Sequence, residues 1–321
     1  MRMSLGSTAR FLGRRLLSSA VVLLGVLVVV FAIVQLVPGD PVRLALGTRY
    51  TQEAYDALNA ASGLDRPLVE QFFSYVGGAL TGDLGVSFRN GQPVSQLLLE
   101  RLPATLSLAA AGIVIALLIA VPAGIWSALR EGRASDAIVR LGSQAGVSIP
   151  DFWLGLLLIG LFSTTLGWLP PSGYTALADD PLEWLRRVAL PGLTVGLVAG
   201  AIMTRYIRSA VLDVASAGYV RTARSKGLAP SVVTGRHIVR GALVPVLTIA
   251  GIQLATILGG VIVVEVVFAW PGLGRLVFDS VSARDYPMIQ GSVLLIAVMF
   301  LIVNLIVDVL YAVVDPRIRL A

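Results

Sequence analysis

The stretch LLSSAVVLLGVLVVVFAIVQLV, residues 16–37, is 22 residues long and carries no charge. A helix rises about 1.5 Å per residue, so this run reaches roughly 33 Å, enough for a hydrocarbon core of about 30 Å. Because backbone groups cannot stay unpaired in lipid, the run is predicted to be a transmembrane helix. The number of such runs then decides the fold.

Five further apolar stretches follow: residues 102–129, 141–169, 188–204, 241–264 and 286–307. Composition agrees, because 56% of the 321 residues are hydrophobic and 14% are charged, whereas a soluble domain carries about a quarter charged residues. We therefore predict an all-α membrane protein with six transmembrane helices. The fourth span is the least secure, because it has only 17 residues and contains Pro191.

Basic residues indicate the orientation. With an even number of spans, both termini lie on one side together with residues 130–140 and 205–240. That side holds 16 Lys and Arg against 9 on the other, and five of those nine lie in the long segment 38–101, where the rule is weak. Both termini and the 205–240 loop are therefore predicted to be cytoplasmic.

The N-terminus leaves two alternatives. Arg10, Arg14 and Arg15 precede the first apolar run, as in a cleavable signal peptide. The run is longer than a typical signal-peptide core, and no small-residue cleavage site follows it. We expect an uncleaved first helix, with residues 1–37 forming a cytoplasmic N-terminus and the first span.

Segment 38–101 is predicted to be a small helical cap on the extracytoplasmic side. Helical patterning covers residues 52–62 and 66–80, and glycines then break it. The amphipathic run 94–101 is expected to lie at the membrane interface before the second span. Residues 102–321 would form a five-helix core.

Several kinds of chemistry are excluded. The chain has no Cys and a single His, His237, so disulfides, thiolate nucleophiles and multi-His metal sites are ruled out. No phosphate-binding loop, His-Glu-x-x-His or Gly-x-Ser-x-Gly motif is present. We expect no cofactor or metal in this chain and no catalysis by it, so energy for any transport must come from another subunit or an ion gradient. The net charge of +6 points to topology and anionic lipid rather than nucleic acid.

Three polar residues inside predicted spans are candidates for a translocation path: Asp151, Gln253 and Asn304. An intramembrane carboxylate is costly and normally faces a cavity or a partner. Asp151 either lines a pathway or pairs with Arg140 or Arg205, and Pro150 should bend its helix. The amides of Gln253 and Asn304 serve equally well to join helices.

Other span residues favour structural roles. Arg205 and Arg208 end the fourth span and are expected to extend to the cytoplasmic surface. The spacing Gly196-x-x-x-Gly200, together with Gly251 and the pair 259–260, favours close helix packing.

The segment YVRTARSKGL, residues 219–228, is a basic stretch between two apolar runs. As a helix over 219–226, it places Tyr219, Ala223 and Lys226 on one face. Gly227 suits a left-handed helix C-cap, and Pro230 should prevent the helix from resuming. We interpret this basic loop as a docking surface for a soluble partner; the alternative is a plain positive-inside loop.

These segments, in order, resemble a known family: the transmembrane permease subunit of binding-protein-dependent ABC importers, in the oligopeptide/dipeptide/nickel group and as the first of its two permease subunits. The resemblance covers essentially the whole chain and rests on RRLL (14–17), LVPGDP (36–41), GLDRPL (63–68), GDLG (82–85), ERLPAT (100–105), YVRTARSKGL (219–228), EVVFAWPGLG (265–274), RDYP (284–287) and DPR (315–317).

In that family the cytoplasmic loop has the pattern Glu-Ala-Ala-x-x-x-Gly and forms the coupling helix. Here the sequence from Arg221 to Gly227 occupies that pattern, with the last Ala and the Gly matching and the Glu and first Ala replaced. The resemblance implies that this loop inserts into a nucleotide-binding subunit through Tyr219, Arg221, Thr222, Ala223, Arg224, Lys226, Gly227 and Leu228.

The resemblance also implies partners: a second homologous permease subunit, two ABC ATPase subunits that hold ATP and Mg, an extracytoplasmic solute-binding protein and the lipid of a bacterial inner membrane. Arg49 and Arg89 are candidates for docking the binding protein. Peptides are the favoured solute, with nickel chelates and glutathione-like thiols open. An ion-gradient transporter or channel is the alternative, and it would show inverted repeats and paired intramembrane charges. An intramembrane enzyme would need a nucleophile–base pair.

Overall fold

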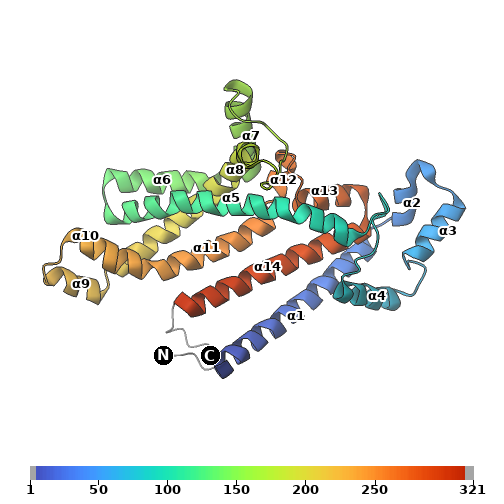
Figure 1. Cartoon of the computed structure of the whole chain (residues 1–321), viewed down its shortest axis with the longest axis horizontal. Helices are drawn as coiled ribbons and strands as arrows, with labels where there is room; N and C mark the ends of the chain where they lie inside the picture. The colour runs from blue at the N-terminus through green and yellow to red at the C-terminus, as the bar shows by residue number, and fades with distance from the viewer. Residues whose placement is uncertain (1–4, 315–321) are drawn as a thin grey trace. The chain divides into compact units, whose positions relative to one another are not determined.

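The structure is a computed structural model that describes the backbone of residues 5–314, with side chains from Gly13 to Val309 apart from Pro41 and Arg49. The DPR segment at 315–317 therefore lies outside the described residues. Five described helices are long and apolar enough to cross a bilayer (Figure 1): α1 (Leu5–Leu36), α5 (Val94–Leu129), α8 (Pro181–Ala215), α11 (Arg240–Gly260) and α14 (Tyr286–Val314). A sixth span results if one bent helix pair is counted as a single crossing. The prediction of an all-α membrane protein is confirmed.

The predicted third span is not one straight helix. Residues 134–165 form α6 (Ala134–Ser148), α7 (Asp151–Leu158) and the π-helical turn η2 (Ile159–Thr165), with a bend of 102° between Ser148 and Asp151. Pro150 lacks an N–H donor and disfavours a helical residue before it, which accounts for the break at Ile149. The predicted bend beside Asp151 is confirmed. Asp151 lies at the start of α7 instead of mid-helix.

The chain divides into two compact units. Unit 1 comprises Met1–Thr105 and Pro271–Leu301, and unit 2 comprises Leu106–Trp270 and Ile302–Ala321. Helices α5 and α14 contribute to both.

In unit 1, short helices follow α1: α2 (Pro41–Leu46), the 3-10 turn η1 (Gly47–Arg49), α3 (Gln52–Ala61) and α4 (Leu68–Thr81). Helix α4 packs on the last turns of α1, where the Phe31 ring meets Phe72 edge-on at 5.4 Å and Tyr75 at 6.3 Å. The helices predicted at 52–62 and 66–80 are therefore present. The stretch 94–101, expected to lie at the membrane interface, forms the first turns of α5 and is continuous with the second span, because Pro103 does not break that helix.

The start of α14 anchors the loop that precedes α5. The buried carboxylate of Asp285 accepts hydrogen bonds from the hydroxyl of Ser87 and, at 3.1 Å, from the backbone N–H of Phe88. The guanidinium of Arg284, at the end of α13 (Leu273–Ala283), donates to the carbonyl of Pro38 at 2.9 Å. Asp285 and Arg284 thus connect the junction between α13 and α14 to two segments that lie 198 and 246 positions away in the sequence.

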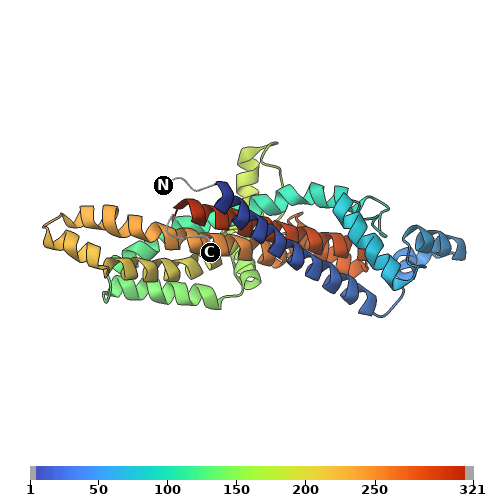
Figure 2. The ribbon, with the colours of Figure 1, turned by 90° about the horizontal axis from the view of Figure 1, so that it is seen from below.

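In unit 2, α8 is the central helix, and α6 runs beside it (Figure 2). Three glycines bring α8 close to α5: a Cβ on Gly196 would lie 2.6 Å from Ile115, and one on Gly112 would lie 2.7 Å from Val195. Gly200 lies against the backbone of Ala116. The predicted close packing at Gly196 and Gly200 is confirmed, and Pro191 lies inside a helix of 35 residues without ending it.

Of the two further predictions about glycines, one is confirmed and the other is wrong. Gly251 of α11 packs against Val307 of α14, since a Cβ there would lie 2.5 Å from it, which confirms the prediction. A Cβ on Gly259 or Gly260 would meet no atom of the described chain within 4 Å, so close packing at that pair is wrong. The pair lies at the end of α11, beside the short helix α12 (Ile262–Val267).

Candidate functional site

The basic loop, residues 219–228, contains one short helix between α8 and α11. Helix α9 spans Gly218–Ser225, within a residue of the predicted bounds at each end. α8 ends at Ala215, where the N–H of Ser216 bonds the Leu212 carbonyl at 3.1 Å. Only Ser216 and Ala217 separate the two helices, so α9 is joined closely to α8.

The C-terminus of α9 is closed by backbone hydrogen bonds. Gly227 has a φ of +76°, and its N–H donates to the Arg224 carbonyl at 3.0 Å. The N–H of Leu228 donates to the Ala223 carbonyl at 3.4 Å. These two bonds form a Schellman motif, which needs a left-handed residue at the position of Gly227. The predicted C-cap is confirmed.

The prediction for Pro230 is wrong. Pro230 is the first residue of the next helix, α10 (Pro230–Val232), which continues into the π-helical turn η3 (Val233–Val239) and then α11. Proline is well tolerated at the first helical position, where its missing N–H would have no intrahelical partner. The chain therefore turns back at Gly227 into one helical run that reaches Gly260.

The inner face of α9 is packed within unit 2. The side chains of Val220 and Ala223 are 0% and 6% exposed, and α9 lies against η3, which contributes the buried Val233 and Ile238. Ala223 is thus not on the same open surface as Tyr219 and Lys226, although the helical spacing grouped them. Its small size lets α9 sit close to its neighbours.

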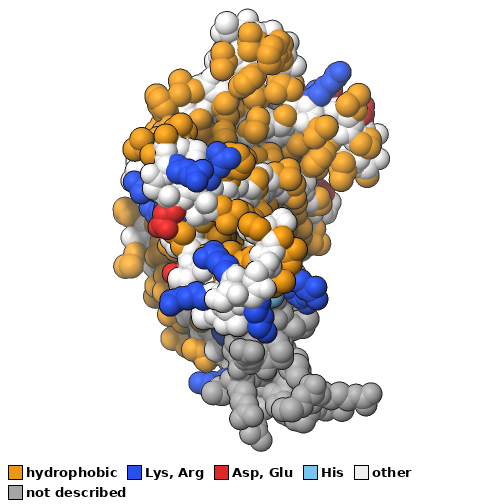
Figure 3. Space-filling view, turned by 90° about the vertical axis from the view of Figure 1, so that its left-hand side faces the viewer, with side chains coloured by type: hydrophobic (Ala, Val, Ile, Leu, Met, Phe, Trp, Pro, Cys, Tyr) orange, Lys and Arg blue, Asp and Glu red, His pale blue; other side chains and the backbone are white. Residues whose placement is uncertain are grey.

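The outer face of α9 is cationic and open. Exposed residues on it are Arg221, Thr222, Arg224, Lys226 and Leu228, and Tyr219 is 52% exposed. Arg221 donates to the Ser216 carbonyl at 3.1 Å, which holds one guanidinium against the helix start. Figure 3 shows Lys and Arg side chains gathered on the side that carries this loop. The positive charge of this surface suits contact with an acidic protein groove.

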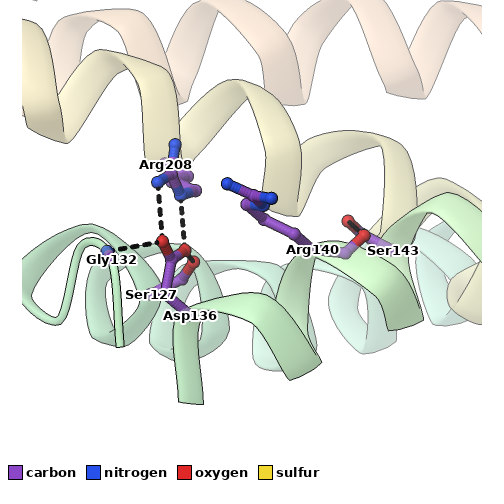
Figure 4. A network of polar contacts seen from close by, with 6 residues as sticks. All are labelled: Ser127, Gly132, Asp136, Arg140, Ser143 and Arg208. Atoms are coloured by element: carbon purple, nitrogen blue, oxygen red, sulfur yellow. Dashed lines mark hydrogen bonds and ion pairs between the residues drawn. The ribbon is translucent and has the colours of Figure 1, made fainter. Parts of the chain in front are cut away.

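Two turns before the end of α8, a buried ion pair joins this helix to α6 (Figure 4). Asp136 and Arg208 pair through two bonds of 2.8 and 2.9 Å, with side-chain exposures of 2% and 16%. The Asp136 carboxylate also accepts from the Ser127 hydroxyl at 2.6 Å and the Gly132 N–H at 3.1 Å. The expectation that Arg208 extends to the surface is wrong, because this carboxylate holds it. Arg205 is exposed, as expected.

Asp136 is a structural residue that the sequence patterns missed. It is 72 positions from Arg208, so no local motif links the two. The segment 130–140 holds two acids, Glu131 and Asp136, among three arginines, and nothing local distinguishes the buried acid from the exposed one.

The three candidate path residues are not brought together. Asp151 is half-buried at the start of α7, Gln253 is buried in α11, and Asn304 is half-buried in α14. No hydrogen bond or ion pair joins any two of them among the described residues, and Asp151 pairs with neither Arg140 nor Arg205. Glu265 of α12 is 0% exposed, in the same short stretch as the buried Phe268 and Trp270.

Of the two docking candidates in unit 1, Arg89 is exposed and lines a pocket of about 430 Å³ with Leu44 and Asp279. The side chain of Arg49 lies outside the described residues. Across the described part of the chain, no group of three or more His, Cys, Asp or Glu side chains is placed to hold a metal ion.

Comparison with known proteins defines the class. Residues 120–320 match the family model described as the binding-protein-dependent transport system inner membrane component, and residues 8–109 match the N-terminal model of the same systems. The chain is therefore a membrane component of a transport system. It belongs to the binding-protein-dependent transport system inner membrane component family, within the peptide-importer group of permease subunits.

Two relatives align along nearly the full length. The di/tripeptide transport system permease protein DppB of Pseudomonas aeruginosa is 40% identical over 96% of this chain and 98% of its own. The glutathione transport system permease protein GsiC of Escherichia coli is 43% identical over 95% of this chain and 97% of its own. The predicted family is confirmed.

Solved structures share the fold. An inward-facing form of the MetNI methionine ABC transporter has a TM-score of 0.56 at 19% identity, covering 68% of this chain and 97% of that one. A crystal structure of an amino acid ABC transporter with histidines gives 0.53 at 17% identity, covering 68% and 94%. At these identities the likeness concerns the fold alone.

Proposed function

We propose that this chain forms half of the translocation path of an ATP-driven importer for peptides or similar small solutes, and that the basic loop couples it to an ATPase subunit. The chain works beside a second homologous permease subunit. Two ATPase subunits bind ATP and Mg, and an extracytoplasmic binding protein delivers the solute. Hydrolysis takes place in the ATPase subunits, and this chain performs no catalysis.

The main support for the coupling role is the structure of α9, which has a packed inner face and an open outer face. Its inner face is packed against η3, its end is fixed by the Schellman motif, and only two residues join it to α8. Its outer face is open and basic. A rigid helix of this kind transmits a displacement of a partner to α8 and α11, and the partner shifts the transport equilibrium only through different contacts in its two states.

The orientation follows from the distribution of basic residues. Placing the basic loop in the cytoplasm puts both termini there and puts residues 38–101 outside, as the positive-inside rule favours. The outside segment then serves as the docking cap for the binding protein, with the exposed Arg89 as a contact. Asp151, Gln253 and Asn304 remain proposed path residues at separate depths.

The relatives support peptides as the solute class. One is named for di- and tripeptides and the other for glutathione, itself a small peptide. A mass-spectrometric census of ligands on the partner binding protein tests this point. Finding short peptides supports it, and finding only nickel chelates or other non-peptide solutes contradicts it.

The importer assignment itself is tested by purifying the chain in mild detergent and reconstituting whatever subunits remain bound. We expect subunits with a nucleotide-binding loop to co-purify, and uptake to require hydrolysable ATP and the binding protein. Uptake driven by an ion gradient, without ATPase subunits, would support the alternative transporter class instead.

A further inference from the structure

We propose that the groove between α6 and α8 binds the phosphate headgroup of an anionic phospholipid through Arg140 and Arg205. The groove encloses about 310 Å³ and is lined by residues of α6 from position 139 to 144 and of α8 from 204 to 209. It lies beside the Asp136–Arg208 pair (Figure 4). The position of the groove at the cytoplasmic leaflet rests on the orientation given under the proposed function.

The charge of the groove calls for an anion. Three of its lining residues are Arg140, Arg205 and Arg208, and none is acidic. Arg208 is already paired with Asp136, whereas Arg140 and Arg205 have no carboxylate partner among the described side chains. Figure 4 shows Arg140 extending from α6 toward α8, on the side of Arg208. Guanidinium groups present planar pairs of N–H donors that match phosphate oxygens.

The hydroxyl protons of Ser143 and Thr204 are not available to a ligand in the groove. Ser143 donates its proton to the Arg140 carbonyl at 2.9 Å, and Thr204 donates to the Gly200 carbonyl at 2.7 Å. Both protons are used within their own helices. The remaining charged donors are the two guanidiniums, which favours a phosphate without protons of its own.

The rim of the groove favours a lipid over a free anion. Leu141 of the groove lining is 71% exposed, and the sequence neighbours Ile138 of α6 and Tyr206 of α8 are 70% and 52% exposed. Both helices belong to candidate membrane spans. Basic side chains at the end of a span reach the lipid headgroups, so Arg140 and Arg205 can contact the phosphate. The exposed apolar side chains beside them can contact the acyl chains of the same lipid.

Native mass spectrometry of the complex, purified in mild detergent and supplied with phosphatidylglycerol or phosphatidylcholine, tests the proposal. The wild type should retain phosphatidylglycerol selectively. Arg140→Gln/Arg205→Gln should retain about tenfold less, because both guanidinium contacts to the phosphate in the groove are lost. The control Arg133→Gln/Arg236→Gln removes the same charge from exposed positions outside the groove and should retain as much as the wild type.

Three outcomes overturn the proposal. One is equal retention of phosphatidylglycerol by all three proteins. In another, inorganic phosphate protects Arg140 and Arg205 from an arginine-modifying reagent and phosphatidylglycerol does not. That result would identify a soluble anion as the ligand. The last is loss of a bound protein chain from the groove variant with lipid retention unchanged, which identifies a protein interface. Co-purification of ATPase subunits is read from the same spectra, so failure of the proposed function is seen separately.

Discussion

Asp136 and Arg208 form a two-bond ion pair, with Nε to Oδ1 at 2.8 Å and Nη2 to Oδ2 at 2.9 Å, that joins α6 to α8. Two more donors, from Ser127 and Gly132, complete the bonding of the carboxylate. The pair lies on the helix that leads directly into the basic loop. It therefore holds α8, the helix that precedes α9, against α6.

Removal of one partner should destabilise the protein. Asp136→Asn or Arg208→Gln leaves a buried group uncompensated, which typically costs about 3–5 kcal/mol. We expect the thermal unfolding temperature in detergent to fall by several degrees in each single variant. The double variant should lose less than the sum, because its partners are removed together. Single variants as stable as the wild type would show that the pair does not hold α6 to α8.

At Gly227, Asn should be tolerated best, Ala less well and Pro not at all. Its φ of +76° is accessible to Asn, strains Ala by about 1–2 kcal/mol and is closed to Pro. Pro also removes the N–H that bonds Arg224. ATPase activity stimulated by the loaded binding protein should be near normal in Gly227→Asn, reduced in Gly227→Ala and lost in Gly227→Pro. Equal activity in all three would contradict the role of the Schellman motif.

Substitutions at the adjacent residues Ala223 and Arg224 should affect different properties, the first stability and the second coupling. Ala223→Glu places a carboxylate in the packed face against η3 and should lower the unfolding temperature. Arg224→Glu reverses an exposed charge, so stability should hold while stimulated ATPase activity is lost. Arg133→Glu, an exposed change outside the loop, is the control and should alter neither. If Arg224→Glu retains full stimulation, the outer face of α9 does not carry the contact.

Asp285 should hold the loop from residue 82 to 93 in place. Asp285→Ala removes the acceptor for Ser87 and Phe88, so hydrogen exchange of that loop should rise about tenfold, as expected for a loss of about 1.4 kcal/mol. Ser87→Ala removes one of the two bonds and should have a smaller effect. Glu53→Ala, an exposed acid of α3, serves as the control. Unchanged exchange in Asp285→Ala would mean that other contacts order the loop.

The features that were predictable from sequence are those set by local composition. Long uncharged runs determine spans because lipid requires internally bonded backbone, and Gly227 marks its helix end because few other residues adopt its conformation. Pro150 marked the bend, although a bend of 102° exceeds what a single proline suggested.

The features that sequence missed depend on contacts between distant segments. Helical spacing placed Ala223 beside Tyr219, and only the packing of η3 shows that Ala223 faces inward. Arg208 at a span end fitted a surface role until Asp136 supplied a buried partner 72 positions away. Pro230 was misjudged for a local reason, because a proline that stops one helix also starts another well.

The central claim, that the basic loop contacts an ATPase subunit, is tested most directly by cross-linking in native membranes. The chain contains no Cys, so Thr222→Cys on the outer face of α9 gives a single thiol for a thiol-to-amine reagent. We predict a cross-linked product whose second chain, by mass spectrometry, carries a nucleotide-binding loop, with a yield that changes on adding ATP. Arg186→Cys, exposed near the other end of α8, should give none. The absence of that product from Thr222→Cys in a complex that still transports, or an equal yield from Arg186→Cys, would contradict the account.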